Sequence, residues 1–367
     1  MLKLKLHWQI LIAFVIAIIL GISIPEHSGY VRWLGDLFLR ALKMIIVPLV
    51  FSSIVSGVAN LGSTSSLGRL GVKTISYYLT TSIMAILTGL LLVDIIKPGV
   101  GADLGFRMDV PEMTSSTGSL GDIIMRMIPT NIFDALASAD MLAIIFFAIM
   151  IGFFIPRVQS EYSDFMIKIF NAIFEVMMKL TSFIIKFAPI GILGIVTGVV
   201  ADQAADKSKL VSMIQHLGIY MITVLAGLSI HFFITLPLIL KFVGKANPFL
   251  HFKAMSLPII TAFSTSSSSA TLPITIEAVE NNSGVSNKIS SFVLPLGATV
   301  NMDGTALYEC VAAMFIAQAY GIELGFVQQI IVVVTALLAS IGAAGIPMAG
   351  LVMMSVVLTA VGLPLEG

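Results

Sequence analysis

Two carboxylates, Asp303 and Glu309, lie in the middle of a long apolar stretch, residues 289–318. A charged side chain at the centre of a bilayer costs about 2.5–3.5 kcal/mol on insertion scales, so such residues are functional by default. Asn301, Asp303 and Gly304 stand close together, which predicts an unwound turn. Its carbonyls and carboxylate would form an oxygen cage for a hard cation such as Na⁺. Potassium or a proton would use similar groups, so position and charge leave the ion open.

Glu309 is also a candidate proton carrier. It lies one helical turn after Thr305, on the same helix face. Burial away from water disfavours the charged form of a carboxylate, so this side chain can hold and release a proton. The alternative is a neutral, hydrogen-bonded residue with a structural role.

Residues 254–279 read as an apolar arm, a polar centre and a second apolar arm, with five serines in the six positions 264–269. Irregular backbone at membrane depth must be buried in protein or line a wet cavity, which predicts a re-entrant hairpin with the serines at its tip. Free N–H groups at the start of a half-helix bind anions. Ser267, Ser268 and their amides are therefore candidates for holding a substrate carboxylate. The alternative is a serine-rich linker.

Residues 326–361 repeat this plan, with apolar arms at 330–338 and 351–361 around the glycine-rich run 340–350. Paired interrupted segments are the best sequence pointer to a transporter's binding site. We expect the first hairpin to enter from the cytoplasm and the second from outside, with their tips near the midplane. The alternative is two kinked helices packed in the core.

The composition indicates a membrane protein built of helices. Apolar residues make up 57% of the 367 residues, charged residues make up 11%, and the mean hydropathy is +1.03. This excludes a soluble enzyme and a disordered chain, and the zero net charge excludes a nucleic-acid binder. Cys310 is the only cysteine, so no intrachain disulfide is possible. The Lys and Arg residues of the loops place the N-terminus in the cytoplasm and the loop 98–125 outside.

Several apolar stretches approach the length needed to cross roughly 30 Å of hydrocarbon. They lie at 8–24, 37–59, 75–96, 131–155, 166–200, 210–241, 289–318 and 326–361.

Three motifs carry a resemblance to a known family. They are Asn301-Met302-Asp303-Gly304-Thr305, the serine tip before Thr271-Leu272-Pro273, and Ser340-Ile341-Gly342-Ala343-Ala344-Gly345-Ile346-Pro347. In this order they resemble the dicarboxylate/amino acid:cation symporters, the family of the excitatory glutamate transporters. The resemblance implies an all-α membrane protein, a glutamate transporter-like bundle with two inverted re-entrant helical hairpins. It also implies a homotrimer in lipid, in which a mobile transport domain moves like an elevator against a static scaffold.

The resemblance implies an order of domains as well. Scaffold helices 1–2 would occupy 1–72, transport-domain helix 3 and an external loop 73–130, scaffold helices 4–5 131–209, and the rest of the transport domain 210–367. Within that last part, the first hairpin would lie at 247–279, helix 7 at 289–318 and the second hairpin at 326–361.

Site residues are implied position by position. The substrate contacts would be Ser266, Ser267, Ser268, Thr305, Ile346 and Gly350. One sodium site would use Tyr78, Thr81, Ser82, Asn301 and Asp303, a second Gly297 and Asn301, and a third Thr299, Ser340, Ile341 and Ala343. Glu309 matches the glutamate that carries a coupled proton in the animal branch.

The implied function is symport of glutamate, aspartate or a C4-dicarboxylate with Na⁺, and with H⁺, across the plasma membrane. The family has a further helix after the second hairpin, whereas this sequence stops at Gly367. That helix supplies part of the substrate site and of one sodium site. We therefore expect that the 367-residue chain alone does not accumulate acidic amino acids. The alternatives are an inactive truncated relative, an ion channel, and an intramembrane hydrolase, for which Asp303 has no partner evident in the sequence.

Overall fold

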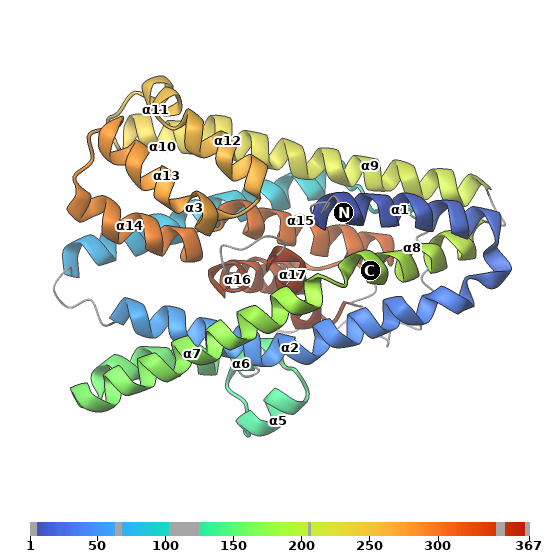
Figure 1. Cartoon of the computed structure of the whole chain (residues 1–367), viewed down its shortest axis with the longest axis horizontal. Helices are drawn as coiled ribbons and strands as arrows, with labels where there is room; N and C mark the ends of the chain where they lie inside the picture. The colour runs from blue at the N-terminus through green and yellow to red at the C-terminus, as the bar shows by residue number, and fades with distance from the viewer. Residues whose placement is uncertain are drawn as a thin grey trace, which may run out of the picture.

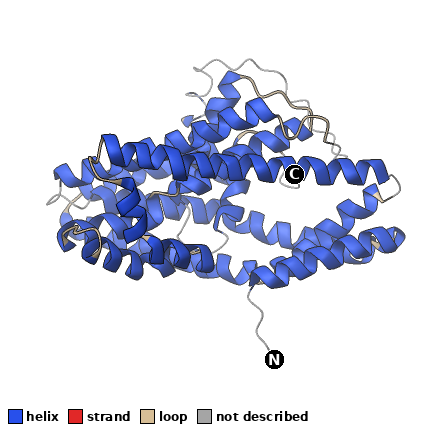
Figure 2. Ribbon diagram, turned by 90° about the horizontal axis from the view of Figure 1, so that it is seen from above, coloured by secondary structure: helices blue, strands red, loops and turns tan. Residues whose placement is uncertain are grey.

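The computed structural model describes residues 6–62, 68–102, 125, 127–204, 207–342 and 349–363. Within these ranges every regular element is a helix, as Figure 2 shows. The predicted all-α class is therefore confirmed. Most of the loop expected at 98–125 lies outside the described residues.

The helices follow one another along the whole described chain (Figure 1). The first half contains α1 (Leu6–Ser23), η1 (Pro25–His27), α2 (Gly29–Gly62), α3 (Gly68–Ile96), α5 (Ile132–Ala137), α6 (Met141–Phe154), η3 (Ile155–Arg157), α7 (Ser160–Ile185) and α8 (Ala188–Gln203). The second half contains α9 (Lys207–Ile230), the π-helix η4 (His231–Thr235), α10 (Leu236–Phe242), α11 (Pro248–Ala254), α12 (Ser256–Thr265), α13 (Ser268–Asn281), α14 (Asn287–Val300), α15 (Asp303–Ala319), α16 (Phe326–Gly342) and α17 (Ala349–Ala360).

Three described helices are long and apolar enough to cross a membrane: Gly29–Asn60, Leu70–Ile96 and Ser208–Phe242. The apolar stretch expected at 166–200 is divided between α7 and α8, which meet at 53° and together are long and apolar enough for one broken span. Pro189 lies in the first turn of α8. Proline has no N–H and disfavours a helical conformation in the residue before it, so a new helix starts here instead of the old one continuing.

The helices form two packing groups (Figure 1). In the first group, α1 and α2 pack on α8, and α2 also packs on α6 and α7. In the second group, α3, α9 and α15 pack on one another. The pair α16 and α17 contacts both α15 of the second group and α2 of the first. Helix α15 is the centre of its group, since most of its side chains are buried.

Both interrupted segments fold as pairs of helices that pack on each other, α12 with α13 and α16 with α17. The first pair is joined by Ser266 and Ser267, and Ser266 adopts a left-handed conformation with φ of 51° that ends α12. Figure 1 shows α12 and α13 side by side, and their far ends are joined by the Asn282 amide, which donates to the carbonyl of Ala254 at 3.2 Å. The turn of the second pair, 343–348, lies outside the described residues.

Candidate functional site

The apolar stretch 289–318 is broken where its polar residues cluster. Helix α14 ends at Val300 and α15 begins at Asp303, and between them Asn301 and Met302 have non-helical backbone angles. The predicted unwound turn is thus confirmed. Asp303 occupies the first turn of α15, where the unpaired N–H groups of a helix start favour a negative charge.

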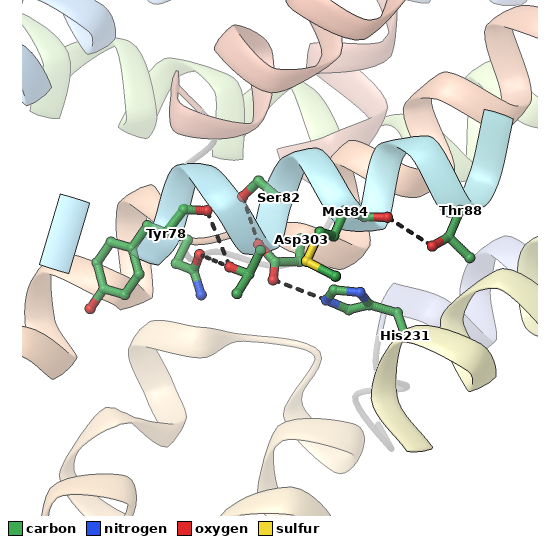
Figure 3. Close-up of polar contacts among 8 residues, drawn as sticks. Tyr78, Ser82, Met84, Thr88, His231 and Asp303 are labelled. Atoms are coloured by element: carbon green, nitrogen blue, oxygen red, sulfur yellow. Dashed lines mark hydrogen bonds and ion pairs between the residues drawn. The ribbon is translucent and has the colours of Figure 1, made fainter. Parts of the chain in front are cut away.

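Polar side chains of α3 converge on this turn, as Figure 3 shows for Ser82 and Asp303. The hydroxyl of Ser82 donates to Oδ1 of Asp303 at 2.6 Å. Thr81 donates through Oγ1 to Oδ1 of Asn301 at 3.1 Å. One turn earlier, Tyr78 donates its hydroxyl to the backbone carbonyl of Val293 in α14 at 2.6 Å. The structure therefore brings Thr81, Ser82, Asn301 and Asp303 into contact, whereas Tyr78 lies one turn away on α3 with its phenol against α14.

This cluster fits a hard cation. Its donors are hydroxyl, amide and carboxylate oxygens, which Na⁺ and similar ions prefer. A hydroxyl that donates its proton keeps lone pairs for a cation. Asp303 is only 9% exposed, and Ser82 and Thr81 are almost completely buried. A carboxylate in such a place needs a positive partner, which a bound cation supplies.

One residue of the cluster is absent from the sequence-based site. Nε2 of His231 lies 3.0 Å from Oδ2 of Asp303, on the other side of the carboxylate from Ser82 (Figure 3). Both side chains are buried. The sequence did contain a signal, because a histidine in the apolar stretch 210–241 is a polar group at membrane depth.

Two of the residues expected at the substrate lie side by side. The phenol of Tyr308, three residues after Thr305 on α15, donates to the carbonyl of Gly350 on α17 at 2.9 Å. A Cβ atom placed on Gly350 would lie 3.3 Å from Cγ2 of Thr305. The start of α17 thus packs directly on Thr305. Ile346, the other expected contact from this segment, lies outside the described residues.

The serine tip forms the start of a half-helix, as expected. The Ser267 hydroxyl accepts the N–H of Ala270 at 3.3 Å and so caps α13. Ser267 is buried, whereas Ser266 and Ser268 are exposed. The structure therefore does not gather these serines with Thr305 into a closed site.

The remaining cation residues are spread around α14 and α16, which pack on each other. Thr299 is exposed and donates to Leu296 within its own helix, and the buried Ser340 likewise donates to Leu337. Each of these two hydroxyls thus donates within its own helix, and the resemblance implies that this third set binds a cation mostly through backbone carbonyls. Ile341 is half-buried, and Ala343 lies outside the described residues.

Glu309 is completely buried on α15. Neither of its carboxylate oxygens has a hydrogen-bond partner in the part of the chain that the structure describes. The alternative role of Glu309, as a neutral residue held by hydrogen bonds, therefore has no hydrogen bond to support it within the described chain.

Gly297 allows Tyr78 to reach α14, and we expect Gly297→Ala to weaken the response of the protein to Na⁺. An added Cβ would lie 2.7 Å from the Tyr78 hydroxyl and would displace it from the Val293 carbonyl. Because residues that orient ligands typically change ion affinity 10–100-fold, we expect the half-saturating Na⁺ concentration for thermal stabilisation to rise roughly tenfold. Gly218→Ala on α9 is the control, since its Cβ would meet open space. Equal Na⁺ responses of the two variants would contradict the prediction.

Comparison with known proteins places this site in a family. The sequence model of the sodium:dicarboxylate symporter family matches residues 6–367. Excitatory amino acid transporter 3 of Mus musculus is 36% identical over 424 residues, covering 99% of this chain and 80% of the mouse protein. An excitatory amino acid transporter of Caenorhabditis elegans is 37% identical, covering 93% of this chain and 76% of that protein. The proton/glutamate-aspartate symporter of Escherichia coli K12 is 33% identical, covering 100% of this chain and 86% of that protein.

The family and these relatives are transporters, so the predictions of a multi-pass membrane transporter and of no enzyme activity are confirmed. The matched residues span nearly the whole chain, including every element of the site. The chain belongs to the sodium:dicarboxylate symporter family.

Proposed function

We propose that the protein is a secondary active symporter that moves glutamate, aspartate or a C4-dicarboxylate together with Na⁺ across the plasma membrane. The observation that carries this proposal is the buried Asp303 cluster at a break in an apolar segment. Two kinds of relative support the substrate class, since their names state excitatory amino acids and glutamate-aspartate.

We infer that one packing group carries the substrate and the other stays fixed. The cation cluster is built from α3, α14 and α15, and Thr305 and Gly350 lie on α15 and α17. The group formed by α1, α2, α6, α7 and α8 contains none of these residues. This division supports an elevator mechanism with a scaffold at 1–72 and 131–209, in a homotrimer with its N-terminus in the cytoplasm. The two helix pairs would then be the re-entrant hairpins that gate the site.

Two separate parts of α15 are candidates for binding the two coupled ions, Na⁺ and H⁺. The oxygen cluster at Asp303 suits Na⁺, in keeping with the family's description. Glu309 has unpaired carboxylate oxygens within the described chain, and the neutral form is the cheaper one in such a place. We propose that Glu309 carries a proton, and the name of the Escherichia coli relative supports proton coupling in this family.

The test is uptake of radiolabelled aspartate by the full chain in proteoliposomes, with a Na⁺ gradient, a proton gradient or neither. Its companion is the melting temperature of the purified protein in NaCl against choline chloride at equal ionic strength. A Na⁺-specific rise in melting temperature together with Na⁺-driven uptake is the result that we expect.

Each outcome has a separate meaning. Stabilisation by Na⁺ without uptake would support the cation site and contradict the proposed symport. Uptake driven by the proton gradient alone would contradict Na⁺ coupling. Absence of both stabilisation and uptake would contradict the proposed function.

A further inference from the structure

The buried carboxylate of Asp303 is held from two sides by different helices. Ser82 of α3 donates to Oδ1 at 2.6 Å, and Nε2 of His231 lies 3.0 Å from Oδ2 (Figure 3). A carboxylate that binds a cation is ionised and can only accept hydrogen bonds, so Nε2 carries the proton and donates it. With one donor on each oxygen, the carboxylate plane cannot rotate freely.

The backbone around His231 is built to bring its imidazole to this point. The chain leaves α9 in a π-helical turn, in which the N–H of Leu236 donates to the carbonyl of His231 five residues earlier. Pro237 follows at once and has no N–H to donate. A π-turn adds a residue to one turn and shifts the side chains on it, and such turns occur often at functional sites. The turn η4 packs against α3, which carries Ser82.

The other ring nitrogen argues against a role in packing alone. Nδ1 of His231 is buried and has no partner in the described chain, and the side chain is only 4% exposed. An unpaired buried polar atom is costly. An apolar side chain would fill the same space without that cost, so the contact with Asp303 is the feature that requires a histidine here.

We propose that His231 is a positioning residue of the cation site, which holds the Asp303 carboxylate in the orientation that receives Na⁺. This inference rests on the proposed function, since it assigns a further residue to the same site. His231 does not touch the ion in this scheme. It acts as the partner behind a ligand, as the groups that orient metal ligands do.

Substitutions that keep or move the donated hydrogen bond test this role. In glutamine the amide nitrogen is as many bonds from Cβ as Nε2 is in histidine, whereas in asparagine it corresponds to Nδ1. We therefore expect His231→Gln to keep the half-saturating Na⁺ concentration near that of the wild type. Because loss of a partner behind a metal ligand costs 10–100-fold in affinity, His231→Asn and His231→Leu should raise it by roughly that factor.

The measurement is the melting temperature of the full chain in detergent as NaCl replaces choline chloride at constant ionic strength. The half-saturating concentration is compared, because any packing defect lowers the melting temperature itself. His216→Leu is the matched control, since this histidine on α9 contacts the carbonyl of Pro98 at 2.8 Å instead of a carboxylate. It should leave the half-saturating concentration unchanged.

The outcomes separate the inference from the function it rests on. Wild-type Na⁺ dependence in His231→Asn or His231→Leu would overturn the positioning role. An equal loss in His231→Gln would also overturn it, because the donated bond would then not be the cause. If His231→Leu does not fold, the comparison of the glutamine and asparagine variants still decides. A wild-type protein that does not respond to Na⁺ contradicts the proposed function and this inference with it.

Discussion

Asp303→Asn is expected to abolish the stabilisation of the protein by Na⁺ while leaving the fold intact. The substitution removes the only formal charge among the donors of the cluster formed by Tyr78, Thr81, Ser82, Asn301 and Asp303. Two unit charges 4 Å apart attract by about 4 kcal/mol at an effective dielectric constant near 20. Since every 1.4 kcal/mol is a factor of ten in affinity, we expect a loss of about 100-fold or more.

The fold should survive because the neighbours of Asp303 can adapt. An asparagine oxygen can still accept from Ser82, and its amide can donate to Nε2 of His231 once the imidazole adopts its other neutral tautomer. Burying a neutral amide is cheaper than burying a carboxylate. In choline chloride the variant should therefore melt at the wild-type temperature or above it.

The control for this experiment is Asp134→Asn. Asp134 is an exposed acid on α5, away from the cluster, and its replacement should leave the Na⁺ response unchanged. A melting temperature of Asp303→Asn that still rises with NaCl as in the wild type would remove Asp303 from the cation site.

The break at the site could be predicted from the sequence because its residues conflict with their surroundings. Asn301, Asp303 and Gly304 are poor residues for the middle of an apolar span, and the helix is interrupted beside them. The partners on α3 came from the family resemblance instead. They are 220 and 221 residues away in sequence from the groups they contact, and no local pattern encodes such a contact.

His231 was missed for a related reason. Its hydrogen bond to Asp303 joins residues 72 positions apart, and the histidine has no polar neighbour in sequence to mark it. The π-turn that aims it also has no simple pattern, although Pro237 was a local sign that the helix would not continue regularly. A rule that treats every polar side chain in an apolar stretch as functional would have found it.

The hydropathy pattern also does not predict where a helix bends or whether the serine tip is covered by other parts of the fold. The stretch 166–200 is rich in apolar residues, yet it forms two helices at 53°, because a hydropathy average does not register the effect of Pro189 on the backbone. The serine tip was correctly expected to start a half-helix. Whether Ser266 and Ser268 close over a substrate depends on tertiary packing, and in this structure they are exposed.

Gly194→Ala should cause the largest loss of stability among the substitutions considered. Helices α2 and α8 approach each other so closely that a Cβ on Gly194 would lie 2.5 Å from the backbone nitrogen of Gly35 and 2.6 Å from the carbonyl oxygen of Val31. Small residues permit such close packing between membrane helices. Because both obstacles are backbone atoms, no side-chain rotation can relieve the clash, and α2 and α8 must separate.

The cost of that separation can be measured against an uncrowded glycine of α2, the partner helix. Overpacking typically costs 1–3 kcal/mol, so we expect the melting temperature of Gly194→Ala in detergent to fall by several degrees, with its half-saturating Na⁺ concentration unchanged. Gly57→Ala on α2 is the matched control, because its Cβ would meet no atom within 4 Å. Alanine is favoured over glycine inside a helix by roughly 0.5–1 kcal/mol, so this variant should melt at or above the wild-type temperature. Equal melting temperatures for the two variants would mean that α2 and α8 can move apart without a loss of stability.

A fall in the Na⁺ affinity of Gly194→Ala would have a different meaning. It would show that the two packing groups are coupled more tightly than a fixed scaffold and a mobile carrier require.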